Sequence, residues 1–135
     1  MQQESRGEGK RERRYASLVG VLAYFAANRN FGYVDVLANS LDPLTAKETM
    51  INAVRDFMSA CDPERPAREG RDEVPCPRDV KVEYLERDLN LFIGEIESGW
   101  DRFFRVTRNL ALQALARAAS LRFPRQGESK GEGQS

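Results

Sequence analysis

Prolines decide which parts of this chain can form long helices. Four of its six prolines lie in one short stretch: Pro63, Pro66, Pro75 and Pro77. Proline lacks the backbone N–H that a helix uses, and its ring clashes with the preceding turn, so a regular helix cannot continue through residues 62–78. The sequence therefore predicts a long proline-rich loop there, with helical segments before and after it.

Three helices are predicted before the loop. Residues 15–27 are apolar on almost every side, which is typical of a helix buried on most faces. A short amphipathic helix follows, with apolar residues at helical spacing: Val34, Leu37, Ala38 and Leu41. It should stop at Asp42-Pro43, because the residue before a proline avoids the α-helical region. The third helix should begin with a capping box formed by Thr45 and Glu48 and run to about Ala60. Its apolar face comprises Met50, Ile51, Val54, Phe57 and Met58.

Two further helices are predicted after the loop. Residues 80–84 alternate apolar and polar side chains, which fits either a short strand or the frayed start of a helix. The helix that follows should end near Ser98-Gly99, and its apolar face comprises Leu85, Leu89, Phe92, Ile93 and Ile96. The last helix, from Trp100 to Leu121, is the longest one predicted.

These patterns indicate a mainly all-α fold, a single-domain helical bundle of four to five helices with a long proline-rich loop. A short β element around 71–84 is the alternative for that region. The 135 residues, 41% hydrophobic and 31% charged, suit one globular domain that folds in water. The domain should span 15–123. Both ends lack apolar periodicity, so we expect mobile tails at 1–14 and 124–135.

Histidine is absent from the chain, which excludes a Ser-His-Asp triad, a Cys-His pair and a zinc site with histidine ligands. No glycine-rich phosphate-binding loop occurs either. We therefore expect no enzymatic activity, no catalytic residue, no metal, no cofactor and no small-molecule substrate. Cys61 and Cys76 are expected to be reduced thiols, with a disulfide as the alternative. No apolar stretch reaches the roughly 20 residues that cross a bilayer, so a cytoplasmic protein without membrane contact is expected.

Charge is distributed unevenly, although Lys and Arg (21) balance Asp and Glu (21). Residues 79–101 are rich in acidic residues, whereas residues 102–125 contain six arginines and no acid. At helical pitch the last helix has an apolar side and a basic side, and the basic side carries Arg102, Arg105, Arg108 and Arg117. Without acids at i, i+4 to pair with, these guanidinium groups are candidates for binding phosphate.

Two other interpretations of this region compete with phosphate binding. The arginines could pair with acids of the preceding helix, such as Glu95 and Glu97, or they could contact an acidic protein. The second case would make the chain a helical protein–protein interaction module with no nucleic-acid role. Tyr15, Tyr24 and Trp100 could stack on bases, but they lie in apolar patterns, and packing in the core is expected of them.

Two stretches, residues 33–41 and residues 104–118, flank the proline-rich loop. The first contains an Asp-x-x-x-Asn-x-Leu segment from Asp35 to Leu41, and the second is an alanine-rich, arginine-bearing helix. In this layout the chain resembles the small-subunit family of archaeal type I-A CRISPR interference (Cascade) complexes over roughly residues 18–121. The resemblance implies a non-enzymatic subunit of an antiviral ribonucleoprotein, present in several copies. Its partners would be other Cascade subunits, copies of itself, and the backbone of the crRNA or target DNA.

Overall fold

The computed structural model describes residues 15–61 and 74–122. These residues form five helices: α2 (Ala16–Ala27), α3 (Gly32–Asn39), α4 (Pro43–Ala60), α5 (Val82–Ile96) and α6 (Trp100–Arg122). The described stretches contain no strand, so the prediction of an all-α bundle is confirmed. Residues 1–14 and 124–135, predicted as tails, and residues 62–73 of the predicted loop lie outside the described residues.

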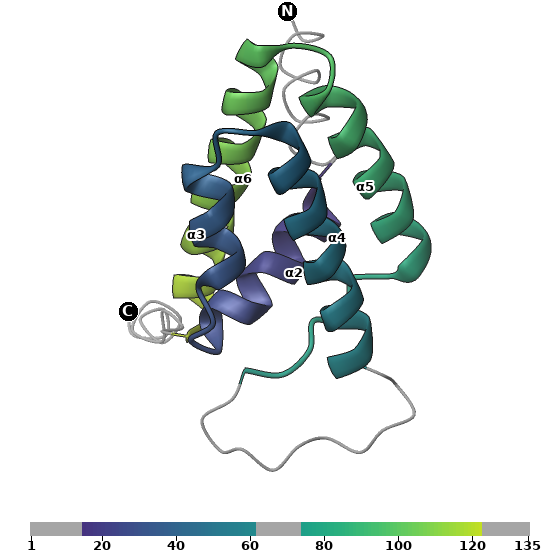
Figure 1. Cartoon of the computed structure of the whole chain (residues 1–135). Helices are drawn as coiled ribbons and strands as arrows, with labels where there is room; N and C mark the ends of the chain where they lie inside the picture. Colours follow the sequence, from purple (N-terminus) through teal and green to yellow (C-terminus); the bar gives the residue numbers. More distant parts are fainter. Residues whose placement is uncertain (1–14, 62–73, 123–135) are drawn as a thin grey trace, which may run out of the picture.

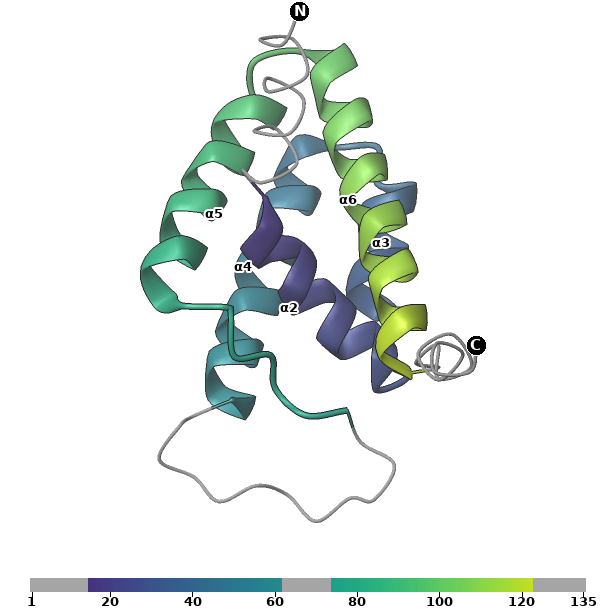
Figure 2. The ribbon, with the colours of Figure 1, turned by 180° about the vertical axis from the view of Figure 1, so that it is seen from behind.

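Helix α2 occupies the centre of the bundle and contacts each of the other four described helices. Figures 1 and 2 show α2 crossing between α5 on one side and the pair α3 and α6 on the other. Leu18, Val21 and Leu22 are completely buried, which confirms that this helix is enclosed on most faces. The rest of the core includes Leu37, Met50, Leu85, Phe92, Phe103 and Leu110.

The N-terminus of α2 is capped by a residue from another helix. Its own N-cap residue, Tyr15, makes no side-chain capping hydrogen bond. Instead, the backbone N–H of Ser17 donates to the Oδ2 atom of Asp88 in α5, at 3.1 Å. Asp88 is 1% exposed, and its burial raises the pKa of the carboxyl above the ordinary value. The carboxylate thus satisfies a free amide at the start of the central helix.

The predicted boundary between the second and third helices is confirmed, but the predicted capping box is wrong. Asp42 is the N-cap of α4, and its carboxylate accepts from the backbone N–H groups of Leu44 and Thr45. The Thr45 hydroxyl donates to the same carboxylate at 2.6 Å. Pro43 therefore occupies the first turn of the helix, where its missing N–H costs nothing, and the helix begins earlier than the Thr45–Glu48 motif predicts.

Two apolar residues assigned to buried faces are exposed. Leu41 lies beyond the end of α3 and is 70% exposed, because the helix stops at Asn39. Met58 is 42% exposed near the end of α4, whereas Met50, Val54 and Phe57 of the same predicted face are buried.

The segment before α5 is held against the bundle by two contacts. The side-chain amide of Asn28, at the end of α2, donates to the carbonyl of Val74 and accepts from its N–H. Cys61 and Cys76 form a disulfide with a Cα–Cα distance of 5.8 Å, so the expectation of reduced thiols is wrong. Residues 74–81 form no strand, and residues 82–84 begin α5, so the helical interpretation of residues 80–84 is confirmed for its second half.

Candidate nucleic-acid interface

Helix α6 carries the predicted basic side chains along the edge of the bundle. It packs against α2, α3 and α5, and Figure 2 shows it running the length of the molecule beside α3. Its buried side is formed by Phe103, Thr107, Leu110, Ala111, Ala114 and Ala118. Thr107 is tolerated in the core because its hydroxyl donates to the carbonyl of Phe103 at 3.0 Å.

Two of the four predicted arginines have acidic partners. Arg102 lies 3.8 Å from Glu95, and Arg117 lies 3.5 Å from Asp79. Both pairs are long and largely solvated, with the Arg102 side chain 56% exposed and the Asp79 side chain 71% exposed. Exposed ion pairs of this kind contribute about 0–1 kcal/mol, so they hold these two guanidinium groups weakly. The alternative of pairing with an acid of the preceding helix is thus realised for Arg102, whereas Arg117 pairs with Asp79, which lies before that helix.

The other two arginines make no ion pair with any residue in 15–61 or 74–122. Arg105 is exposed on the outer side of α6. The guanidinium of Arg108 lies over the Phe104 ring, 4.6 Å from its centroid, an arrangement that orients the group without neutralising its charge. These two cations remain available to an anion.

Arg117 stands apart from the other three arginines along the length of α6. Arg102, Arg105 and Arg108 follow one another at three-residue spacing and spread across the outer side of the first half of α6. Arg117 comes nine residues after Arg108, about two and a half turns, and therefore points to the side of the helix opposite Arg108. The Arg117 side chain reaches Gly20 of α2: a Cβ atom added to Gly20 would lie 3.4 Å from Nη1 of Arg117 and 2.7 Å from Cγ2 of Val80. Arg117 thus packs over α2.

The sequence pattern predicts a basic side along the whole of α6, but the outer side of the helix is basic over only part of its length. Leu112 is 65% exposed and Leu115 is 38% exposed, and Ala116 and Ala119 also face solvent. The basic surface is therefore confined to the first half of the helix, and an apolar surface occupies the second half.

Trp100 is an exposed aromatic residue beside the basic surface, and the prediction that it packs in the core is wrong. Its side chain is 56% exposed. The indole contacts the Phe104 ring edge-to-face, with ring centroids 5.1 Å apart, and Phe104 in turn lies under Arg108. Four-residue spacing on one helix places these three side chains in a row. This spacing is readable in the sequence and was the signal that could have identified Trp100.

Metal clusters and membrane-spanning helices are absent from the described residues. Residues 15–61 and 74–122 hold no group of three or more cysteine or acidic side chains arranged to bind a metal ion. Among the same residues, no helix combines the length and the apolar character needed to span a membrane.

Comparison with known protein families matches the first half of the described helices. The family model of the type I-A Cascade subunit Csa5 matches residues 9–65, which include α2, α3 and α4. The family resemblance read from the sequence is confirmed over this part of the chain. Helix α6 lies outside the matched residues. No curated protein and no solved structure matches the chain.

Proposed function

Residues 9–65 carry the pattern of the type I-A Cascade subunit Csa5 family, and from this premise we propose that the chain is a non-enzymatic subunit that binds nucleic-acid backbone. The proposed contact surface is the first half of α6, with Arg105 and Arg108 as the main phosphate ligands and Arg102 beside them. Arg117 is a weaker candidate, because it pairs with Asp79 and its side chain packs over α2.

One observation carries this proposal. Arg105 and Arg108 have no acidic partner in the described part of the chain, and α6 contains no acid after Asp101. Guanidinium groups bind phosphate through several N–H donors, and they are weakly hydrated, so they exchange water for phosphate readily. The exposed Trp100 beside them adds a flat apolar surface on which a base can stack. Cations next to an aromatic ring favour a single strand, whose bases are accessible.

The binding mechanism we propose is electrostatic and independent of base sequence. Arginines that contact phosphates release counterions, so the affinity falls as salt concentration rises. Two or three contacts give a weak complex for one copy. Several copies held along the same strand raise the effective concentration of each contact, and this gain requires the other Cascade subunits as a scaffold. The subunit would thus hold a strand of the target DNA or the crRNA in the cytoplasm, without membrane contact.

A direct test uses the single tryptophan of the chain as the reporter. Single-stranded oligonucleotides are titrated at low salt into the full-length protein while Trp100 fluorescence is recorded. We expect saturable quenching that is similar for all base sequences and disappears as salt is raised. If oligonucleotides bind but leave the fluorescence unchanged, Trp100 is not part of the binding surface. If the protein binds no oligonucleotide, either alone or together with the partner subunits, the proposal is refuted.

A further inference from the structure

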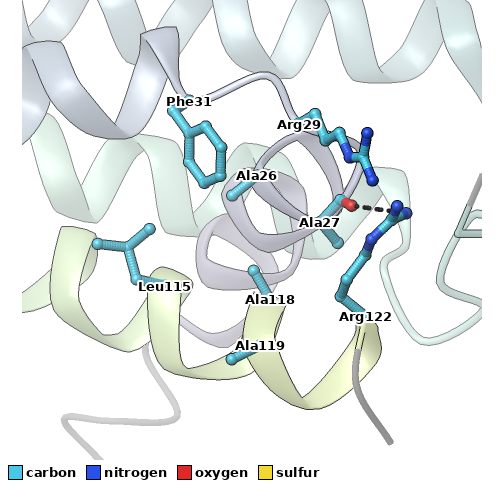
Figure 3. A pocket seen from close by; sticks show the side chains of 8 residues that line it. All are labelled: Ala26, Ala27, Arg29, Phe31, Leu115, Ala118, Ala119 and Arg122. Atoms are coloured by element: carbon cyan, nitrogen blue, oxygen red, sulfur yellow. Dashed lines mark hydrogen bonds between the residues drawn. The ribbon is translucent and has the colours of Figure 1, made fainter.

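An apolar cavity of about 400 Å³ lies where the end of α2 meets the end of α6. Figure 3 shows its lining: small side chains form the floor, Phe31 and Leu115 flank it, and two arginines stand at one edge. The full lining is Ala26, Ala27, Arg29, Phe31, Leu115, Ala118, Ala119 and Arg122. Four alanines leave a space that larger side chains would fill. The cavity is separate from the basic surface formed by Arg105 and Arg108.

The two arginines give this apolar cavity a cationic edge. Arg122 donates to the backbone carbonyl of Ala27 at 3.4 Å, which fixes its guanidinium beside the cavity. Arg29 is exposed and makes no ion pair with any residue in 15–61 or 74–122. An occupant therefore needs an apolar part for the floor and a carboxylate, or another anion, for the edge.

Arg29 is held in a backbone conformation that does not suit arginine. Its φ angle is +70°, the only positive value at a non-glycine residue in the described part of the chain. The N–H groups of Arg29 and Asn30 donate to the carbonyls of Ala26 and Phe25, the pattern that ends many helices with a glycine at this position. An arginine costs about 1 kcal/mol here relative to glycine. The strained backbone of Arg29 therefore lies at the edge of the cavity.

The apolar surface extends beyond the cavity. Leu112 lies one turn before Leu115 on α6 and is 65% exposed, and Phe31 is 52% exposed. An occupant that covers both the cavity and Leu112 must place apolar groups about one helical turn apart. An amphipathic helix with apolar residues at i, i+3 and i+4 does this, whereas a single small molecule or a nucleotide base fills only the cavity.

We propose that this surface binds an acidic amphipathic helix of another protein, with one bulky apolar side chain in the cavity and a carboxylate on Arg29. A second apolar side chain of that helix covers Leu112. The proposal does not depend on nucleic-acid binding, since it uses neither Arg105 nor Arg108.

The test uses full-length protein and a fluorescein-labelled synthetic helical peptide, with leucines at i, i+3, i+4 and i+7 and glutamates elsewhere. A second peptide with glutamine in place of glutamate reports the contribution of charge. Fluorescence anisotropy should show binding of the glutamate peptide, and at least tenfold weaker binding of the glutamine peptide. Carbon-detected alanine methyl signals of Ala118 and Ala119 should shift during the same titration.

Two matched variants locate the binding site. Ala119→Trp fills the cavity and should weaken peptide binding at least tenfold. Ala16→Trp places the same side chain at the exposed first residue of α2, at the end opposite Ala26 and Ala27, and should bind like the wild type. Circular dichroism confirms that both variants fold. Equal binding by Ala119→Trp and wild type, or equal binding of the two peptides, would overturn the proposal. Alanine methyl shifts that appear with a fatty acid or an oligonucleotide, but not with the peptide, would overturn it as well.

Discussion

The carboxylate of Asp88 in α5 caps the first turn of α2 by accepting from the backbone N–H of Ser17, 71 positions earlier in the sequence. Replacing Asp88 with alanine leaves this buried N–H without its partner, which costs about 1–3 kcal/mol of unfolding free energy. We expect the Asp88→Ala variant to unfold at a lower urea concentration than wild type. The slope of unfolding free energy against urea concentration should stay unchanged. An Asp79→Ala variant, which removes an exposed carboxylate, serves as the control and should unfold like wild type.

The same carboxylate makes stability depend on pH. Burial raises the pKa of Asp88 in the folded protein above 3.8, so the folded state binds this proton more tightly than the unfolded state does. The contribution of this group to stability is therefore fully present below pH 3.8 and is lost as pH rises through the folded pKa. Asp88→Asn keeps an oxygen that can accept from Ser17 but does not titrate. As pH rises from 3.8 through the folded pKa of Asp88, the unfolding free energy of wild type should fall relative to that of Asp88→Asn. A pH-independent difference would contradict this account.

Helix α4 offers a test of which residue caps it. Asp42→Ala removes the acceptor for two backbone N–H groups, so we expect a lower thermal midpoint. Glu48→Ala removes the second residue of the capping box that the structure does not form, and it should leave the midpoint unchanged. Hydrogen bonds from Thr45 lower the pKa of Asp42, so its stabilising effect should be lost as pH falls through that lowered pKa. If Glu48→Ala lowers the thermal midpoint more than Asp42→Ala does, the helix is capped by Thr45 and Glu48 instead of by Asp42.

Reduction of the Cys61–Cys76 disulfide should destabilise the bundle. The bond closes a loop with a sequence separation of 15, and loop-closure entropy for that length corresponds to about 3 kcal/mol. A Cys61→Ser, Cys76→Ser variant should unfold at a lower denaturant concentration than the oxidised wild type. Adding a reductant should bring the wild type to the level of the variant and leave the variant unaffected. Mass spectrometry after alkylation shows directly whether the purified protein contains the bond.

Salt titrations separate the arginines of α6 from one another. Each phosphate contact with a single strand contributes about 0.7 to the slope of log affinity against log salt. Arg105→Gln and Arg108→Gln should each lower that slope by about this amount, whereas Arg117→Gln should change it little. Arg55→Gln, on the exposed side of α4, provides the control for net charge. Equal effects of Arg55→Gln and Arg105→Gln would mean that the salt dependence does not come from phosphate contacts on α6.

The helices were predictable because their signals are local. Apolar spacing located the five helices to within a few residues, and proline chemistry located the break between α4 and α5. The Thr45–Glu48 motif failed because the helix begins three residues earlier, with Asp42 as the N-cap and Pro43 in the first turn, so the amides that Thr45 would cap lie inside the helix. The sequence offers both starting points, and it does not rank them.

The candidate sites were less predictable because they depend on packing. Helical pitch placed Arg105 and Arg108 outside, but the ion pairs of Arg102 and Arg117 required the positions of Glu95 and Asp79. The exposure of Leu112 depends on which side of α6 meets α2. The cavity joins the ends of two helices that are far apart in sequence, and no local pattern reports such a meeting.

Because Val80 and Arg117 approach Gly20 closely, the residue tolerated at each of these three positions depends on the other two. Val80 and Arg117 occupy the space that any side chain on Gly20 would need. A larger residue at Gly20 becomes acceptable only if Val80 is shortened in the same protein, and Arg117 must then adopt a new rotamer. Substitutions at these three sites should therefore be non-additive, and related chains should exchange them together instead of singly.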